Sequence, residues 1–223
     1  MIDEIIFNLV KYSPNLIKAL KETLIMVSIS GLFATLFGIP IGIILATTNE
    51  QGLLKNKVVY SILSKLINTL RSIPFAILVA SIPWLVRAIV NTTIGVKGAI
   101  VPLIIASTPF MARQVELALS KVDKGVIEAY QAMGFSNFDI ILKVLLKEGQ
   151  GGIIQGVTLS LVSLVGFSAI AGTVGGGGLG DFALRYGYSS FNPYLMFITL
   201  VIIIALVFII QWVGDLILKE VVH

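Results

Sequence analysis

Long stretches without a charged side chain limit this sequence to a membrane-embedded fold. Uncharged runs occupy residues 23–49, 149–180 and 186–214, and they are 27, 32 and 29 residues long. A helix rises about 1.5 Å per residue and needs about 20 apolar residues to cross a bilayer, so each run is long enough. Only 13% of the residues are charged and 57% are apolar, which leaves too little polar surface for a water-soluble globule. We therefore predict an all-α integral membrane protein.

Two shorter uncharged segments, residues 72–86 and 98–112, each contain two prolines. Proline removes a backbone hydrogen bond, and an unpaired carbonyl group facing lipid is costly. We therefore expect these helices inside the protein, where the prolines either kink buried helices or border a transport path. With flanking residues included, the sequence predicts five transmembrane helices, at about residues 23–47, 66–86, 98–119, 150–174 and 191–214.

The N-terminal segment, residues 1–21, is amphipathic and too highly charged to span a bilayer. We expect it to form an N-terminal interfacial helix that is interrupted at Pro14. Five spans place the two termini on opposite sides of the membrane. A cytoplasmic C-terminus puts ten lysine and arginine residues inside and six outside, which the positive-inside rule favours over the reverse. The predicted orientation therefore has the N-terminus outside and the C-terminus in the cytoplasm.

A polar stretch lies between the third and fourth predicted spans, over residues 120–148, and is called the mid-chain segment below. The sequence predicts two short helices in it, separated at Gly134, because glycine readily adopts the positive φ that ends a helix. Ser120 with Asp123, and Ser136 with Asp139, have the spacing of a helix N-terminal capping box. The mid-chain segment is therefore expected to be folded, not a loose connection.

Both predicted helices of the mid-chain segment have an apolar side. In the first helix, Val126, Tyr130 and Met133 fall on one face. The apolar side of the second consists of Ile140, Ile141, Val144 and Leu145. A short capped helix with such a face fits a groove in a partner protein, but it fits equally well against its own helix bundle. The pattern alone leaves both interpretations open.

The mid-chain segment resembles the "EAA" signature of ABC-importer permeases. The resemblance is carried by Glu128-Ala129-Tyr130, by Gly134 six residues after the glutamate, and by Val144-Leu145-Leu146. Tyr130 replaces the usual alanine, Val144 the usual isoleucine, and Lys147 the usual proline. In that family the signature forms a coupling helix that sits in a cleft of the ATP-hydrolysing subunit. The resemblance implies that this contact is made by Glu128, Ala129, Tyr130, Met133 and Gly134.

Further motifs are similar to those of the methionine-importer permeases. They are the sequences at residues 71–75, 101–102, 108–113 and 172–188. This resemblance implies an ABC type I importer fold, with the transmembrane domain over residues 22–219 and cytoplasmic coupling helices. It further implies a homodimer in the bacterial cytoplasmic membrane, bound to two copies of an ATPase subunit and supplied by an extracytoplasmic substrate-binding lipoprotein. The expected substrate is methionine, in its L form and as a further option its D form; another amino acid or small metabolite is the alternative.

The sequence predicts a transport subunit and not an enzyme. The dipeptide Gly-Lys never occurs, so the chain has no Walker A motif, and ATP and magnesium are expected on the partner ATPase. There is no cysteine, and the only histidine is His223, so no metal site and no cofactor are expected. The expected partners are these proteins and membrane lipid, and no nucleic acid is expected. No aspartate or glutamate interrupts the centres of the predicted spans, which disfavours a secondary transporter driven by protons or sodium without ATP.

Two groups of residues outside the mid-chain segment are candidate sites. Pro74 and Phe75 are candidates for the transport path or the dimer axis. A helical face of the fourth span, made of Gly152, Gly156, Ser160, Ser163 and Phe167, is either a packing seam of small residues or part of that path.

Asp181 and Arg185 follow the glycine run at residues 175–178 and stand four residues apart. This spacing favours an ion pair on a short helix. The pair is either an ordinary surface contact or a contact with the extracytoplasmic binding protein.

Overall fold

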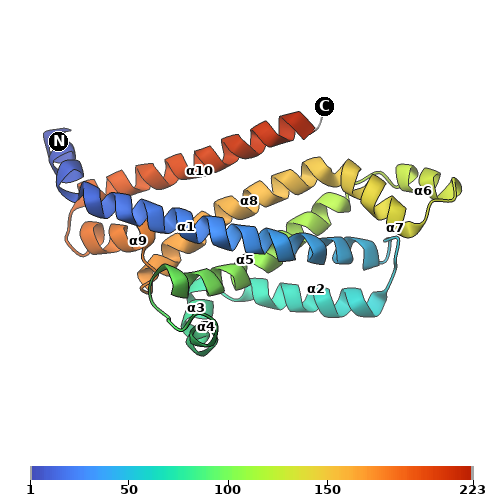
Figure 1. Cartoon of the computed structure of the whole chain (residues 1–223), viewed down its shortest axis with the longest axis horizontal. Helices are drawn as coiled ribbons and strands as arrows, with labels where there is room; N and C mark the ends of the chain where they lie inside the picture. Colours follow the sequence, from blue (N-terminus) through green and yellow to red (C-terminus); the bar gives the residue numbers. More distant parts are fainter. Residues whose placement is uncertain (1, 222–223) are drawn as a thin grey trace. The chain divides into compact units, whose positions relative to one another are not determined.

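The protein is helical throughout the described part of the chain. The computed structural model describes residues 2–221, and no strand occurs within them. Figure 1 shows four long helices, α1 (Ile2–Thr48), α5 (Gly95–Leu119), α8 (Leu146–Thr173) and α10 (Pro193–Val221). Each contains a stretch long and apolar enough to cross a membrane. The predicted all-α membrane fold is therefore confirmed.

The second predicted span differs from expectation. Residues 66–86 were expected to form one helix, but the chain forms α2 (Lys57–Ser72), α3 (Phe75–Ser81) and α4 (Pro83–Val90). Pro74 is the N-cap of α3 and Pro83 is the first residue of α4. Proline has no N–H to donate and disfavours a helical conformation in the residue before it, so helices begin at both positions. A fifth span exists only if the bent pair α2 and α3 crosses the membrane together.

The prolines in α1 and α5 do not interrupt their helices. Pro102 and Pro109 lie inside α5, and Pro14 lies inside α1. The break expected at Pro14 is therefore wrong. Pro14 cannot donate to the carbonyl oxygen of Val10, but the hydroxyl of Ser13 donates to that oxygen at 2.9 Å and replaces the missing bond. Residues 2–21 form the first part of α1; their location at the membrane interface stays a prediction.

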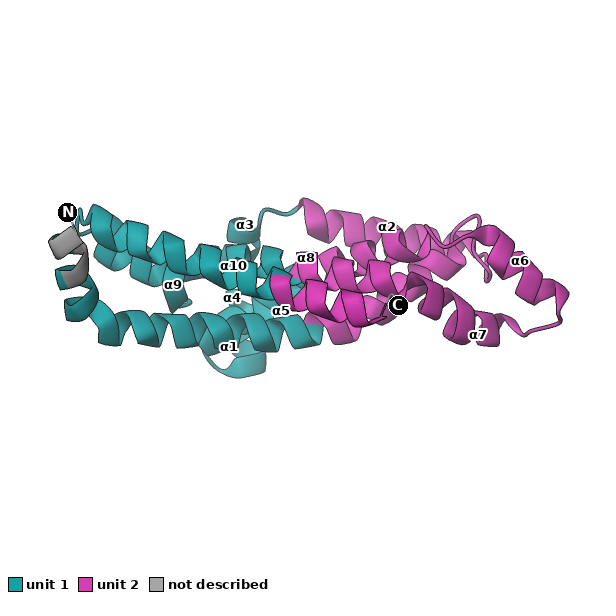
Figure 2. Ribbon diagram, turned by 90° about the horizontal axis from the view of Figure 1, so that it is seen from above, with its two compact units in different colours: residues 1–33, 73–107, 161–211 teal, residues 34–72, 108–160, 212–223 magenta. Residues whose placement is uncertain are grey.

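The chain divides into two compact units, coloured separately in Figure 2. Unit 1 contains residues 1–33, 73–107 and 161–211. Its larger core has Met26, Leu103 and Leu164 at its centre. A second core contains Phe182 of α9 (Gly178–Phe182) and Leu195 of α10. A π-helical stretch, η2 (Ala183–Tyr188), follows α9.

Unit 2 contains residues 34–72, 108–160 and 212–223. In it α1 packs closely on α5, because Gly38 and Gly42 leave room for the neighbouring backbone. A methyl group at Gly42 would lie 2.6 Å from the carbonyl oxygen of Ala112, so no larger residue fits there without a shift. Small residues four apart are a common helix-packing device in membranes. Two apolar cores flank this contact, one with Val115 and Leu119 and the other with Leu45, Ile67 and Ala112.

Candidate functional site

The first helix of the mid-chain segment is α6 (Lys124–Ala132), and its N-cap is Asp123. The Asp123 carboxylate accepts a hydrogen bond from the Gly125 N–H at 2.6 Å. Ser120 does not take part, because α5 ends at Leu119 and the Ser120 hydroxyl donates back to the carbonyl of Leu117. The Ser120–Asp123 capping box predicted from the sequence is therefore wrong. A single aspartate caps the helix instead.

Helix α6 ends in a Schellman turn at Gly134, which has a φ of 83°. The Gly134 N–H donates to the carbonyl of Gln131 at 3.0 Å, and the Phe135 N–H donates to that of Tyr130 at 3.2 Å. The rings of Tyr130 and Phe135 meet edge to face, which supplies the apolar contact typical of this turn. The predicted break at Gly134 is confirmed, and backbone and side-chain contacts both hold it in place.

A second cap follows directly. Ser136 is the N-cap of α7 (Asn137–Asp139), and its hydroxyl accepts the Asp139 N–H at 3.2 Å while donating to the Asp139 carboxylate. The ammonium of Lys143 binds the same carboxylate. The predicted pairing of Ser136 with Asp139 is confirmed. A π-helical stretch, η1 (Ile140–Leu145), then leads into α8.

The inner side of the mid-chain segment rests on its own unit. Ile127 of α6 packs against the core that contains Leu119 of α5 and Leu145 of η1. The Lys124 ammonium binds the side-chain oxygen of Gln51, in the loop between α1 and α2, at 2.6 Å. Beside this contact, α6, the loop and the end of α5 line a hollow of about 210 Å³. Helix α6 is thus attached both to the core of its unit and to the loop between α1 and α2.

The outer side of the mid-chain segment is exposed. Four of the predicted coupling residues, Glu128, Ala129, Met133 and Gly134, are exposed, and Tyr130 is half-buried. Two exposed aromatic side chains were not predicted: Phe135, and Phe138, whose exposed fraction is 69%. Their position on both sides of Ser136, in an otherwise polar stretch, was the available signal. Large exposed apolar side chains outside the lipid-facing helices indicate a contact surface.

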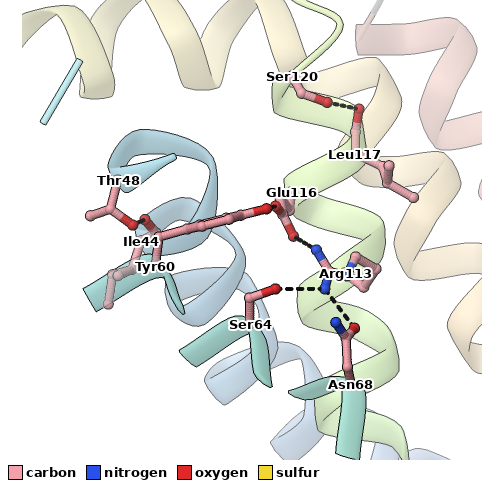
Figure 3. Close-up of polar contacts among 9 residues, drawn as sticks. All are labelled: Ile44, Thr48, Tyr60, Ser64, Asn68, Arg113, Glu116, Leu117 and Ser120. Atoms are coloured by element: carbon pink, nitrogen blue, oxygen red, sulfur yellow. Dashed lines mark hydrogen bonds and ion pairs between the residues drawn. The ribbon is translucent and has the colours of Figure 1, made fainter. Parts of the chain in front are cut away.

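A polar cluster around the buried Glu116 joins α2 to α5 in the same unit (Figure 3), and it is called the α2–α5 polar cluster below. Its members are Tyr60, Ser64, Asn68, Arg113 and Glu116. Arg113 and Glu116 pair along α5, with side chains 16% and 8% exposed. The sequence reasoning did not identify this cluster. The available signal was the spacing of the polar residues, three apart on α5 and four apart on α2.

The predicted pathway residues are only partly brought together. Phe75 of α3 is buried and stacks on Phe167 of α8, with ring centroids 5.1 Å apart. Pro74, beside it, is exposed.

The small-residue face of α8 packs against α5 within unit 2. A methyl group at Gly156 would lie 2.9 Å from Cβ of Gln114, and one at Gly152 would lie 2.9 Å from Cβ of Ala118. Ser160 is buried, and its hydroxyl donates to the carbonyl of Gly156. These contacts favour the packing interpretation for this face. A pathway role for Ser160, and for Ser163, which is half-buried in unit 1, stays a prediction.

The glycine run of unit 1 is held by α1. The Gly178 N–H donates to the Glu22 carboxylate and the Leu179 N–H donates to the Thr23 hydroxyl, both at 2.8 Å. Asp181 and Arg185 form the predicted ion pair, at 3.1 Å. Both line a hollow of about 260 Å³ together with Glu22. Contact between this pair and a binding protein stays a prediction.

Within residues 2–221, no group of three or more acidic, histidine or cysteine side chains has the arrangement of a metal site. The features that stand out are an exposed capped turn and the α2–α5 polar cluster around the buried Glu116. Neither has the arrangement of nucleophile, base and oxyanion donor that covalent catalysis needs.

Comparison with known proteins defines the class to which this chain belongs. The family described as binding-protein-dependent transport system inner membrane component matches residues 38–223. The chain is therefore a member of this family, a multi-pass inner-membrane permease of the ABC importer class. The family resemblance inferred from the mid-chain segment is confirmed.

Individual relatives narrow the comparison. The probable D-methionine transport system permease protein MetI of Vibrio cholerae is 47% identical over 211 residues, which are 95% of this chain and 94% of that protein. The methionine import system permease protein MetP of Bacillus subtilis is 44% identical over 78% of each chain. A solved structure of the MetNI methionine ABC transporter in an inward-facing conformation has a TM-score of 0.91 and 41% identity, over 95% of this chain and 98% of the other. The expected ABC type I importer fold is confirmed.

Proposed function

We propose that this chain is the membrane-spanning subunit of an ATP-driven methionine importer. It works as a homodimer with two copies of an ABC ATPase and receives substrate from an extracytoplasmic binding lipoprotein. The observation that carries the proposal is the mid-chain segment, whose two caps and Schellman turn present an exposed surface in a chain without a Walker A motif. The identity to methionine permeases over nearly the whole chain supports the substrate.

The energy comes from the partner, which binds ATP and magnesium. Closing of the two ATPase subunits displaces the mid-chain segment, and the transmembrane helices change between outward and inward access. Moving a two-state protein from 1:99 to 99:1 takes about 5.5 kcal/mol of differential binding. A segment that transmits this free energy to the transmembrane helices must be rigid. The hydrogen-bonded caps at Asp123 and Ser136 and the turn at Gly134 give α6 that stiffness.

The ATPase contact is made by the exposed side of α6 and the turn after it. Glu128 meets a basic group of the ATPase, while Ala129 and Gly134 permit close approach. Met133, Phe135 and Phe138 fill an apolar groove, as the exposed side of an amphipathic helix does in other complexes. Tyr130 acts indirectly, because its ring supports Phe135.

The remaining candidate residues have places in the same scheme. Phe75, stacked on Phe167 beside Pro74, forms an apolar part of the path or of the dimer axis, where a thioether contacts aromatic rings favourably. Ser160 and Ser163 belong to the same path or axis. The N-terminus lies outside and the C-terminus in the cytoplasm, so that Asp181 and Arg185 face the binding protein.

Uptake in proteoliposomes tests the proposal. The permease is purified with its ATPase, reconstituted, and supplied with the binding protein, ATP inside the vesicles and labelled L-methionine or D-methionine outside. We expect methionine uptake that requires ATP and stops with a non-hydrolysable ATP analogue. Uptake of a different amino acid but not methionine would overturn the substrate. Uptake without ATP would overturn the class of mechanism.

A further inference from the structure

In the α2–α5 polar cluster, the charged groups of Arg113 and Glu116 pair with each other and bind polar side chains of α2. The Glu116 carboxylate accepts the Tyr60 hydroxyl on one oxygen, at 3.1 Å, and pairs with Arg113 on the other. The other end of the Arg113 guanidinium donates to Ser64 at 3.1 Å and to Asn68 at 2.6 Å. A buried ion pair whose remaining hydrogen bonds are made is tolerated, whereas removal of one partner leaves an uncompensated charge. These bonds reach α2 at Tyr60, Ser64 and Asn68, which Figure 3 draws beside Arg113 and Glu116.

Helix α2 also contacts α5 outside this cluster: Ile67 shares a small apolar core with Ala112, and the Arg71 guanidinium lies 5.7 Å from the centroid of the Phe110 ring. Ile67 is its one fully buried residue, and Val58, Ile62 and Leu66 are exposed. In a membrane, lipid solvates such apolar side chains as well as a protein does, so they do not drive helix association. Hydrogen bonds between helices and close packing hold membrane helices together. The α2–α5 polar cluster therefore supplies hydrogen bonds that attach α2 to α5.

The same turn of α5 supports the mid-chain segment. Glu116 stands between Val115 and Leu119, which form one core with Ile141 and Leu145 of η1, and Ile127 of α6 packs on that core. One face of this turn thus holds α6 and η1, and Glu116 reaches α2. Ser120, where the mid-chain segment starts, is four positions after Glu116 in the sequence.

We infer that Glu116 is a positioning residue that makes α2 move together with the mid-chain segment. Displacement of α6 reaches α5 through the Val115–Leu119 core and reaches α2 through Glu116 and Arg113. Helix α2 is followed along the chain by Pro74 and Phe75, which belong to unit 1. The inference rests on the proposed function, since it assigns a route for the motion that the ATPase delivers.

The variant Glu116→Gln tests the inference in the complete complex in proteoliposomes. The amide keeps the shape of the side chain and can still accept the Tyr60 hydroxyl, but it no longer neutralises Arg113. We expect ATP hydrolysis within about twofold of the unaltered complex and methionine uptake at least about tenfold lower, because typical coupling free energies correspond to about 5–150-fold effects. Glu220→Gln makes the same chemical change at an exposed position of unit 2 and is expected to leave both rates unchanged.

Tyr60→Phe provides a milder variant in case Glu116→Gln fails to assemble. It removes one hydrogen bond but leaves the ion pair, so we expect the same loss of uptake relative to hydrolysis, smaller in size. Uptake and hydrolysis that fall in step, or uptake that does not fall in either variant, would overturn the inference. If the unaltered complex itself imports no methionine, the proposed function fails, and this result is separate from the effect of Glu116.

A distance measurement tests the joint motion directly. The chain has no cysteine, so spin labels at Val58→Cys and Leu117→Cys, both exposed in unit 2, report only on α2 and α5. Complexes are purified with the labels on one of the two copies. We expect the same label separation with and without ATP in the unaltered chain, and a separation that changes with ATP in Glu116→Gln. A separation that changes equally in both would overturn the inference.

Discussion

The rings of Tyr130 and Phe135 pack edge to face, with centroids 5.2 Å apart, across the turn at Gly134. The contact closes the end of α6 and fixes the direction in which the following chain leaves it. It also gives the Tyr130 side chain a structural role at the end of α6. The Tyr130 ring packs against Phe135 and so stabilises the turn.

Gly134→Val is expected to impair coupling, because its backbone has positive φ and a β-branched residue does not adopt that conformation without a cost of about 1–2 kcal/mol. No atom lies within 4 Å of a methyl group added there, so the effect comes from the backbone alone. Gly134→Asn is the matched control, since asparagine tolerates positive φ. We expect reduced co-purification of the ATPase and reduced uptake for valine, with near-normal values for asparagine. Equal loss for both variants would contradict this explanation.

Asp123→Ala is expected to loosen the start of α6 by about 1 kcal/mol, because the Gly125 N–H loses its acceptor. Asp123→Asn retains a side-chain oxygen and is expected to behave as the unaltered chain. The measurement is hydrogen exchange of the amides of residues 124–128 in the purified complex. Faster exchange in Asp123→Ala alone is the expected result, and equal rates in all three chains would contradict the cap.

Phe138→Ala is expected to weaken binding of the ATPase by about thirtyfold, because truncation of an aromatic residue at an interface centre typically costs about 2 kcal/mol. Phe208→Ala, on the apolar helix α10, removes an equally exposed ring outside the mid-chain segment and serves as the control. Affinity is measured by titrating labelled ATPase onto the permease in nanodiscs. Weakening by both variants to the same extent would remove Phe138 from the contact.

Gly42→Leu is expected to destabilise unit 2, because its side chain would collide with the Ala112 backbone and with Val115. Overpacking of this kind typically costs about 1–3 kcal/mol. Gly166→Ala, where no atom lies within 4 Å of the added methyl group, is expected to be neutral. Thermal denaturation of the purified permease in detergent measures the difference. A midpoint unchanged by Gly42→Leu would exclude close packing of α1 on α5.

Local signals predicted much of the fold. Charge-free length identified the long helices, and the glycine at residue 134 and the Ser136–Asp139 spacing identified the turns of the mid-chain segment. The effect of each proline was harder to predict, since it depends on the surroundings. Pro74 is the N-cap that precedes a helix, whereas Pro14 lies within one, where the Ser13 hydroxyl replaces the missing bond.

The α2–α5 polar cluster could not be found from local patterns. Glu116 and Arg113 are three residues apart, but the bonds that make them a connection go to Tyr60, Ser64 and Asn68, about fifty residues earlier in the chain. Sequence spacing shows that each helix has a polar face and does not show which faces meet. For the same reason the sequence left open whether the small residues of α8 pack or line a path, until the contact of Gly156 with Gln114 was seen.

The π-helical stretch η1 contains a hydrogen bond from the Leu146 N–H to the carbonyl of Ile141, one residue further back than in an α-helix. The turn where the mid-chain segment joins α8 therefore contains one residue more than an α-helical turn would. Conversion of this stretch to an α-helix would rotate the preceding helix α7 relative to α8 by about 100° around the helix axis, which is the angle of one residue. Helix α8 itself would stay intact. The length of this junction can therefore change by one residue step while α8 stays helical.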